Sequence, residues 1–421
     1  MRADLLIHNI GELVTCGSQG PKKGSAMADS GILKNAGVAV VDGKIHSVGD
    51  SDTVLRLHVA EDVIDAAGRA LMPGFVECHT HIVYAGDRLD EFELRIKGAD
   101  YLEILEKGGG ILSTVKATRE ASVDELVELS SVRLDRLMAN GVTTCEIKTG
   151  YGLDTETEMK MLEAILRLGD EHPVDVVPTF LPAHAVPPEF RNGDKGSADD
   201  YVAQICDEMI PKAAEWFESA GGEGIFIDVF CEKNAFDLEQ SRRILEAAKK
   251  AGFGVKAHVD EFTNLGGAEL AISLGATSID HLEAISDREI KLLAGSETIG
   301  VVTPTVNFNL GSDEFADARK LIDSGCAVAV STDYNPGSAP CPSPSMAMAI
   351  ACRYQKMLPA EAINGFTINA AHALGKGAET GSIEIGKRAD LLILDTRDHR
   401  EICYEFGGNL VETVIKDGIP V

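Results

Sequence analysis

The sequence predicts an α/β fold, a (β/α)8 TIM-like barrel with a small β-sandwich domain built from both termini. Three observations support this prediction. Residues 73–375 alternate short β-branched runs with amphipathic helical stretches, which is typical of a parallel sheet. Residues 1–72 and 376–421 consist instead of short strand-like runs separated by Gly, Asp and Ser. A length of 421 residues also exceeds one ordinary domain and suits a large barrel with a smaller companion.

The two ends of the chain have the same strand-like character. Runs at 4–9, 37–41 and 44–48 precede the middle region, and runs at 389–395 and 411–415 follow it. Asp-Gly pairs at 42–43 and 417–418 are strong hairpin signals. We therefore expect one β domain that combines residues 1–72 with residues 376–421.

The middle region contains eight candidate strands, each followed by a helical or loop stretch. The strands end near His79, Lys148, His184, Cys231, His258, His281, Thr303 and Asp333. Typical helical stretches cover 123–138, 157–168, 238–250 and 316–324. Eight such units form a barrel over 73–375, whose active site lies at the carboxyl ends of the strands.

Composition and charge exclude several classes of protein. With 44% hydrophobic and 25% charged residues, the chain is typical of a well-packed globular protein. A net charge of −28 disfavours nucleic acid and anionic membranes as partners. Nine cysteines without a Cys-x-x-Cys pair argue against a disulfide framework and a zinc ribbon. No apolar run reaches the ~18 residues of a membrane helix, so we expect a cytoplasmic protein.

Polar residues at the predicted strand ends indicate a metal site. His79 and His81 are two positions apart, so both imidazoles point to the same face of a strand. Alone, this spacing favours metal binding, and the alternative is two hydrogen-bonded polar residues at a strand end. His258, His281 and Asp333 close three further strands. Three imidazoles and a carboxylate suit Zn²⁺ or Fe²⁺ with one position left open for water. Such an ion makes hydroxide available near neutral pH.

Three motifs resemble the metal-dependent amidohydrolase superfamily over nearly the whole chain. They are residues 73–81, residues 331–333 and the closing Gly-Ser-Ile-Glu-Ile-Gly-Lys-Arg-Ala-Asp of residues 381–390. The resemblance implies one Zn²⁺ or Fe²⁺/Fe³⁺ ion per subunit, with the ligands His79, His81, His258 and Asp333. Binuclear members of the superfamily add a carboxylated lysine on the fourth strand. Here the nearest lysine, Lys233, falls just past the end of that strand, so the resemblance implies a mononuclear site. His281 is then expected beside the metal-bound water, without necessarily binding the ion.

Finer motifs resemble the imidazolonepropionase family within that superfamily. They are residues 86–92, 98–101, 108–112, 146–153, 183–187 and 333–338. The resemblance implies hydrolysis of the cyclic amide C–N bond of 4-imidazolone-5-propanoate to N-formimidoyl-L-glutamate, in histidine degradation. It also implies a small anionic heterocyclic substrate and a homodimer. The alternative is a mononuclear amidohydrolase of another small nitrogen heterocycle, such as a cytosine- or guanine-type deaminase.

The resemblance assigns the substrate's carboxylate to Arg88. A guanidinium can hold a carboxylate bidentately, whereas the alternative for Arg88 is an ion pair with Asp90 or Glu91. Tyr101 and Tyr151 are expected to donate hydrogen bonds to the carboxylate or the ring, and the alternative for each is plain packing.

The remaining expected roles concern the reacting ring. His184 would polarise the ring carbonyl, and Asp333 would take the water's proton while His281 steadies the nucleophile. Glu261 would contact a ring nitrogen and shuttle a proton, or else orient His258. A loop beside Asp333 is expected to hydrogen-bond the ring or the tail through Asn335, Gly337 and Ser338.

Two segments depart from the pattern of that family. Thr303–Asn309 replaces a more apolar Leu-Pro-Gly-Ala-like stretch, and Pro182 stands where a glycine is more usual. Both departures are expected on the pocket wall, where they would influence which ring substituents fit.

Overall fold

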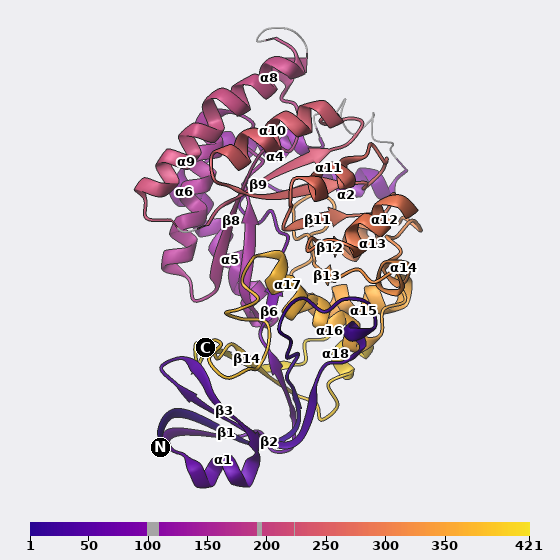
Figure 1. The fold of residues 1–421 in the computed structure, drawn as a ribbon. Coiled ribbons are helices and arrows are strands. Elements are labelled where there is room, and N and C mark those ends of the chain that lie inside the picture. Colours follow the sequence, from indigo (N-terminus) through magenta and orange to yellow (C-terminus); the bar gives the residue numbers. More distant parts are fainter. Residues whose placement is uncertain (99–108, 192–195, 223) are drawn as a thin grey trace.

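The computed structural model describes residues 1–98, 109–191, 196–222 and 224–421, and it contains two sheets (Figure 1). One sheet holds eight parallel strands in the order β13-β12-β11-β10-β9-β8-β7-β6. Their bounds are β6 Phe75–Glu77, β7 Val142–Lys148, β8 Asp175–Ala183, β9 Phe226–Cys231, β10 Gly254–Val259, β11 Ser278–His281, β12 Ile299–Val302 and β13 Val328–Val330. Each corresponds to a predicted strand, which confirms the α/β fold with a parallel eight-stranded sheet.

The sheet curls so that its two edge strands, β6 and β13, approach each other at their carboxyl ends. An isolated parallel bridge joins Thr80 to Tyr334, and the backbone N–H of His81 donates to the carbonyl of Tyr334 at 2.9 Å. The buried carboxyl of Glu77 accepts from the hydroxyl of Thr332 at 2.7 Å. These contacts bring the end of the first strand against the end of the eighth, where the expected ligands lie.

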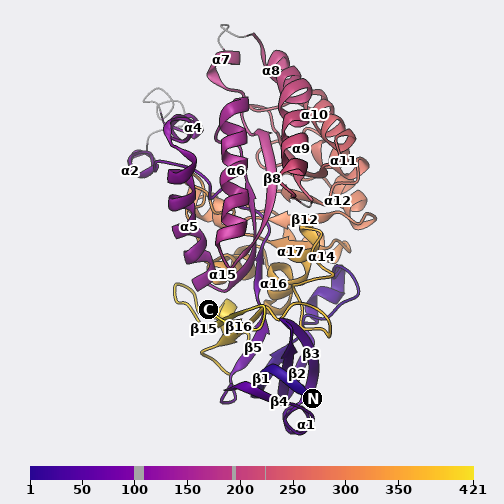
Figure 2. The ribbon, with the colours of Figure 1, turned by 90° about the vertical axis from the view of Figure 1, so that its left-hand side faces the viewer.

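Helices surround the outer face of the curled sheet (Figure 2). They are α2 Leu89–Ile96, α4 Ile111–Glu120, α5 Val123–Ala139, α6 Thr155–Glu171, α7 Pro188–Arg191, α8 Ala198–Gln204, α9 Ile210–Ser219, α10 Leu238–Lys250, α11 Gly267–Ser273, α12 Asp287–Ala294, α13 Pro304–Leu310, α14 Ala318–Asp323, α15 Pro344–Tyr354, α16 Pro359–Phe366 and α17 Ile368–Ala373, with a π turn, η2, at Ile205–Met209. Capping boxes at Ser122 and Asp237 begin α5 and α10 by satisfying free backbone N–H groups. The four predicted helices are present.

The second sheet combines strands from both termini, as predicted. Its order is β16-β15-β14-β5-β1-β2-β3, with β4 paired to β1. The strands are β1 Arg2–Val14, β2 Ile32–Val41, β3 Lys44–Asp50, β4 Val59–Asp65, β5 Ala70–Pro73, β14 Leu391–Leu394, β15 Val411–Lys416 and β16 Ile419–Pro420; the accompanying helices are α1 Ser51–Leu57 and α18 Glu401–Tyr404. Asp42 and Gly43 both have positive φ, as do Asp417 and Gly418, which is what the predicted tight hairpins require.

This mixed sheet folds over, so the two layers of the predicted sandwich are parts of one continuous sheet. An isolated antiparallel bridge joins Lys44 at the start of β3 to Arg388 just before β14. Between the layers lies an apolar cluster that includes Ile7, Val38 and Ile393. The limits of the two domains, 1–72 plus 376–421 and 73–375, stay a prediction.

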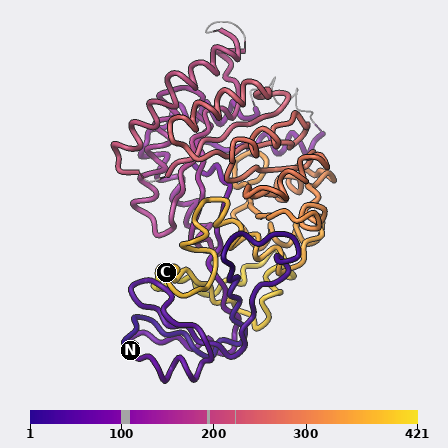
Figure 3. The backbone as a smooth tube through the Cα atoms, viewed as in Figure 1, coloured from indigo at the N-terminus to yellow at the C-terminus, as the bar shows by residue number. Residues whose placement is uncertain are grey.

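Residues 15–31 leave the β domain and lie along the barrel before the chain returns to β2 (Figure 3). This segment includes a short 3-10 helix, η1, at Gly24–Ala28. The side-chain amide of Asn364 donates to the carbonyls of Met27 and Asp29, and that of Asn369 donates to the carbonyl of Lys22. Within the described ranges, none of the helices combines the length and the apolar character needed to cross a bilayer.

Candidate active site

The expected metal ligands meet at the carboxyl ends of the barrel strands. Ligand atoms of His79, His81 and Asp333 lie within 4.8 Å of one another, and so do those of His79, His258 and His281. All five side chains are buried. The two groups share His79, so the structure brings the four expected ligands and His281 into one cluster.

The Nε2 atoms of the histidines converge on one point. Nε2 of His81 lies 3.3 Å from Nε2 of His79 and 3.4 Å from Nε2 of His258. Oδ1 of Asp333 lies 3.6 Å from the Nε2 atoms of both His79 and His81. Burial, together with the neighbouring histidines, lowers the pKa of the His79 and His81 imidazoles, so both rings are neutral and able to bind a metal.

Two buried carboxylates fix the orientation of these rings. Nδ1 of His79 lies 2.7 Å from Oδ2 of Asp280, and Nδ1 of His258 lies 3.0 Å from Oδ2 of Asp228. A carboxylate only accepts hydrogen bonds, so Nδ1 of His79 carries the proton and its Nε2 presents a lone pair to the cluster. The Asp228 carboxylate at 3.0 Å favours the same tautomer in His258. Facing lone pairs beside the Asp333 carboxylate repel one another unless a cation lies between them. The donor set therefore fits a cation such as Zn²⁺ or Fe²⁺.

A fully buried lysine, Lys148, holds the two carboxylates. Its Nζ lies 2.8 Å from Oδ2 of Asp228, 2.9 Å from Oε2 of Glu146 and 3.6 Å from Oδ2 of Asp280. Nζ of Lys256 lies 2.8 Å from the other oxygen of Glu146. Although burial alone would raise it, the pKa of Asp228 is held well below its usual value by His258 and Lys148. These four residues, Glu146, Asp228, Lys256 and Asp280, had not been predicted as part of the site.

The backbone is strained where the strands end at the site. Asp260, His281 and Asp333 have φ values of 56°, 85° and 48°, in the left-handed region that residues other than glycine rarely adopt. Left-handed residues of this kind cluster at functional sites, where the surrounding structure holds them. Here they re-aim the chain immediately after β10, β11 and β13.

His184 and Tyr151 lie beside the histidine cluster. The rings of His81 and His184 stack with centroids 4.9 Å apart, and Tyr151 lies 5.4 Å from His184. Nδ1 of His184 lies 3.1 Å from the carbonyl of Gly150, where an added Cβ would meet that nitrogen at 2.8 Å. Burial lowers the pKa of His184 to about 3, so the free ring is neutral, donates from Nδ1 and presents a lone pair at Nε2.

Arg88 makes the ion pair that was the alternative to substrate binding. Its Nε and Nη2 donate to the two oxygens of Glu91 at 2.8 and 2.6 Å. Nη1 faces Gly337, where an added Cβ would lie 2.3 Å from it. The predicted partner Tyr101 lies outside the described residues. In this structure, therefore, Glu91 occupies the bidentate face of Arg88.

The loop after β13 is held by its own side chains. Oδ1 of Asn335 accepts from the backbone N–H groups of Gly337 and Ser338, each at 2.8 Å. Its Nδ2 donates to the carbonyl of Asp333 at 2.8 Å and to the hydroxyl of Ser338 at 2.9 Å. Asn335 thus shapes the loop beside the ligands, and its predicted contact with a ligand stays a prediction.

Glu261 lies close to other carboxylates at the mouth of the barrel. Burial raises the pKa of its carboxyl well above the usual value, and Glu283 and Glu232 raise it further. Both ring nitrogens of His258 face other groups, Asp228 and His81. Glu261 is therefore not the partner that orients His258, which leaves its predicted contact with a ligand.

The segment Thr303–Asn309, which departs from the family pattern, follows β12 directly and forms most of α13. Oγ1 of Thr303 lies 3.2 Å from Nδ1 of His281, so the departing segment touches the cluster directly. The side-chain amide of Asn309 donates to the carbonyl of Ser338 at 2.7 Å and so braces the loop after β13.

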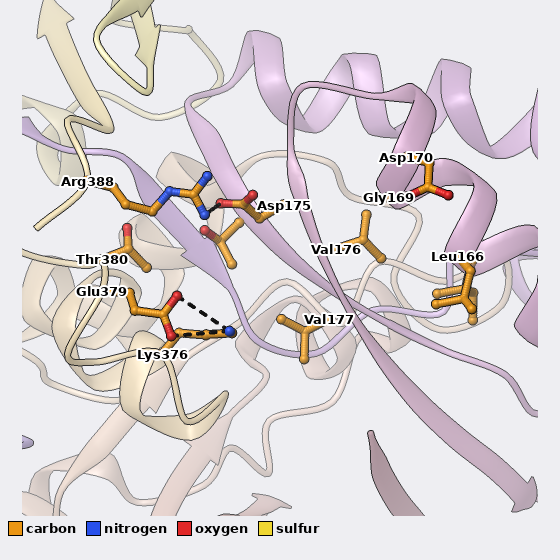
Figure 4. A pocket seen from close by; sticks show the side chains of 12 residues that line it. Leu166, Gly169, Asp170, Asp175, Val176, Val177, Lys376, Glu379, Thr380 and Arg388 are labelled. Atoms are coloured by element: carbon orange, nitrogen blue, oxygen red, sulfur yellow. Dashed lines mark hydrogen bonds and ion pairs between the residues drawn. The ribbon is translucent and has the colours of Figure 1, made fainter. Parts of the chain in front are cut away.

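A separate cavity of about 260 Å³ lies between α6, the start of β8 and residues 376–388 (Figure 4). It is lined by none of the predicted site residues. Four of its charged side chains pair with each other: Arg388 lies 2.8 Å from Asp175, and Lys376 lies 3.2 Å from Glu379. Because these charges are neutralised within the wall, we place the site at the histidine cluster and not in this cavity.

Sequence reasoning missed the buried charges beneath the ligands, although a signal was present. Glu146, Lys256 and Asp280 lie inside short strands whose other residues are mostly apolar or small. Charged residues are almost never buried unless they are paired. Several charged residues on inward-facing positions of neighbouring strands therefore indicate an internal ionic network, even though their pairing cannot be read from spacing.

Comparisons with known proteins agree with this geometry. The sequence profile of the amidohydrolase family matches residues 70–421. An imidazolonepropionase of Chloroflexus aggregans is 50% identical over 420 residues, covering 99% of this chain and 97% of that protein. One of Geobacillus kaustophilus is 47% identical over 420 residues, covering 98% and 97%.

Solved structures agree at the level of the fold. An adenosine deaminase from Xanthomonas campestris with bound zinc has a TM-score of 0.73 at 19% identity, covering 100% of this chain and 93% of that one. The guanine deaminase of E. coli has a TM-score of 0.72 at 16% identity, covering 99% of each chain.

Proposed function

The chain belongs to the imidazolonepropionases of the amidohydrolase family, and we propose that the cluster described above carries out their reaction. That reaction is the hydrolysis of the cyclic amide C–N bond of 4-imidazolone-5-propanoate to N-formimidoyl-L-glutamate, in histidine degradation. Identity near 50% over almost the full length carries this conclusion. The convergence of His79, His81, His258 and Asp333 supports it with a metal site of suitable chemistry.

His79, His81, His258 and Asp333 would hold one ion, Zn²⁺ or Fe²⁺/Fe³⁺. When bound, the ion supplies Lewis acidity that makes water a hydroxide source near neutral pH. Asp280 and Asp228 keep the ligating nitrogens of His79 and His258 turned toward it.

Proton transfer falls to the carboxylates around the cluster. Asp333 accepts a proton from the attacking water, and His281, buried beside it, orients the nucleophile. After attack on the ring carbonyl, the departing ring nitrogen needs a proton. Asp333 returns the proton it accepted, or Glu261 supplies one, since burial raises the pKa of the Glu261 carboxyl and favours its protonated form. The C–N bond then breaks.

His184 stabilises the oxyanion only in its protonated form. With Nδ1 donating to Gly150, a neutral ring has no N–H at Nε2 to offer to an oxygen. A developing negative charge next to Nε2 favours uptake of a proton there, and the imidazolium then donates from both nitrogens. His184 thus responds to the charge of the intermediate more strongly than to the neutral substrate.

Arg88 holds the propionate of the substrate, either beside the Glu91 carboxylate or in its place. Its pairing with Glu91 keeps the guanidinium in place beside Gly337. The substrate's carboxylate adds to Nη1 or displaces Glu91, and Tyr151 and Tyr101 donate to the tail or the ring. Asn335, Gly337 and Ser338 form the adjoining wall.

A deaminase of cytosine- or guanine-type rings has support only from the fold, since those structures are under 20% identical. The direct test is turnover of freshly generated 4-imidazolone-5-propanoate by purified protein, with and without a chelator. Chelator-sensitive formation of N-formimidoyl-L-glutamate, identified by its mass, is the expected result. A metal-loaded protein that leaves this substrate intact but deaminates a nucleobase would refute the assignment.

Two further predictions concern the protein as a whole. The family resemblance implies a homodimer, and the absence of a long apolar run in the sequence is the reason we expect a cytoplasmic protein. Sedimentation of the purified protein and fractionation of producing cells test these two predictions directly.

A further inference from the structure

Glu283 is a carboxylate at the mouth of the barrel that the reaction outlined above does not use. It follows the end of β11, two residues after His281. Both of its side-chain oxygens are shielded from solvent, and neither has a partner at hydrogen-bond geometry in the described part of the chain. Leaving buried polar atoms unpaired costs stability, so such atoms point to a ligand or to a functional constraint.

Asn307 on α13 lies near the Glu283 carboxyl. Burial raises the pKa of Glu283 to about 8, and the nearby Asn307 side chain partly offsets this shift. Nδ2 of Asn307 donates to the carbonyl of Glu314 at 2.8 Å, which leaves Oδ1 buried and without a partner among the described residues. Asn307 lies in the segment where the sequence departs from the family pattern. The departure thus places a buried amide side chain near Glu283, with one oxygen that has no partner among the described residues.

The backbone immediately before Glu283 is strained. His281 and Leu282 have consecutive φ values of 85° and 74°, both in the left-handed region. Each such residue other than glycine costs free energy that the surrounding structure must supply. A regular turn would avoid this cost, so the conformation is retained for where it directs the chain after His281.

The Asn307 oxygen accepts hydrogen bonds, and a cationic ligand would lower the pKa of Glu283 and leave its carboxylate as an acceptor as well. The imidazolone ring has an N–C–N edge, and ring opening converts that edge into the formimidoyl amidine of the product. Amidines are strong bases whose protonated form is a planar cation with N–H groups directed outward, as in a guanidinium. A carboxylate and an amide oxygen together suit this group. Arg88, which follows β6, would hold the opposite, anionic end of the same molecule.

We propose that Glu283, assisted by Asn307, recognises the amidine end of the substrate and product by accepting hydrogen bonds from its N–H groups. This inference rests on the proposed function, because it assigns a further specificity-determining residue to the same reaction. Under this proposal, the turn after β11 and the segment Thr303–Asn309 together form one side of the pocket for the ring.

The test compares two ligands that differ only at this end. N-formimidoyl-L-glutamate carries the amidine, and N-formyl-L-glutamate replaces it with a carbonyl oxygen that cannot donate. Binding to the metal-loaded protein is measured by calorimetry for the wild type, Glu283→Gln and Asn307→Ala. Glu269→Gln is the matched control, because Glu269 pairs with Arg288 on the surface of α11. Thermal unfolding verifies that each variant is folded.

The wild type and Glu269→Gln should bind the formimidoyl ligand at least about tenfold more tightly than the formyl ligand. Glu283→Gln should lose most of that preference, and Asn307→Ala part of it. In turnover, Glu283→Gln should raise KM more than it lowers kcat. A wild type that hydrolyses the substrate while both variants keep the full preference would overturn this inference and leave the proposed function standing. A wild type that does not hydrolyse it would overturn both.

Discussion

Removal of the buried lysine beneath the ligands tests whether the ionic network supports the metal site. Lys148→Met removes the ammonium that lies 2.8 Å from Asp228, 2.9 Å from Glu146 and 3.6 Å from Asp280, all fully buried. Removing one partner of a buried ion pair costs about 3–5 kcal/mol, because the remaining charge is uncompensated. Asp228 and Asp280 orient His258 and His79, so metal affinity should also fall, by about 10–100-fold.

The matched control is Lys256→Met. Lys256 is equally buried and pairs with Glu146 at 2.8 Å. It makes no ion pair with Asp228 or Asp280, although its charge lowers the pKa of Asp280. Urea unfolding of the metal-free proteins should show both variants destabilised. Competition with a chromophoric zinc chelator should show weakened binding for Lys148→Met, which affects both Asp228 and Asp280, and a smaller loss for Lys256→Met, which affects only Asp280. Equal metal affinity in the wild type and both variants would refute the reasoning.

Three further predictions follow from the same geometry. Arg88→Ala should reduce kcat/KM for 4-imidazolone-5-propanoate by about 2–5 kcal/mol of transition-state stabilisation, and unchanged kinetics would contradict the role of Arg88. Burial raises the pKa of Glu158 to about 7 from its ordinary 4.5, so its stabilising contribution is full below pH 4.5 and is lost as pH rises to 7. Unfolding at several pH values should therefore show the wild type losing up to about 3 kcal/mol relative to Glu158→Gln over that range, and a constant difference would exclude this pKa. Saturating Zn²⁺ at about 1,000 times its Kd should stabilise the protein by about 4 kcal/mol, and His258→Ala should abolish most of this gain in thermal melts; equal gains in both proteins would place the ion elsewhere.

Much of the fold and of the ligand set could be predicted from the sequence, because both depend on local periodicity. Alternating strand and helix patterns identified all eight strands of the parallel sheet. The carboxyl ends of parallel strands meet at one end of a barrel, so residues such as His79, His258 and Asp333 could be placed together without knowing any distance. The two Asp-Gly turns were equally local, since their positive φ values depend on adjacent residues alone.

Only the tertiary structure determined which groups face each other across the barrel. Lys148 reaches Asp228, 80 positions away, and His79 reaches Asp280, 201 positions away, so no spacing rule connects them. The contact of Thr303 with His281, 22 positions away, likewise depends on how the segment after β12 packs at the barrel mouth. Periodicity determines the face on which a side chain lies. The partner it meets depends on packing between distant segments, where burial makes each charge require a specific neighbour.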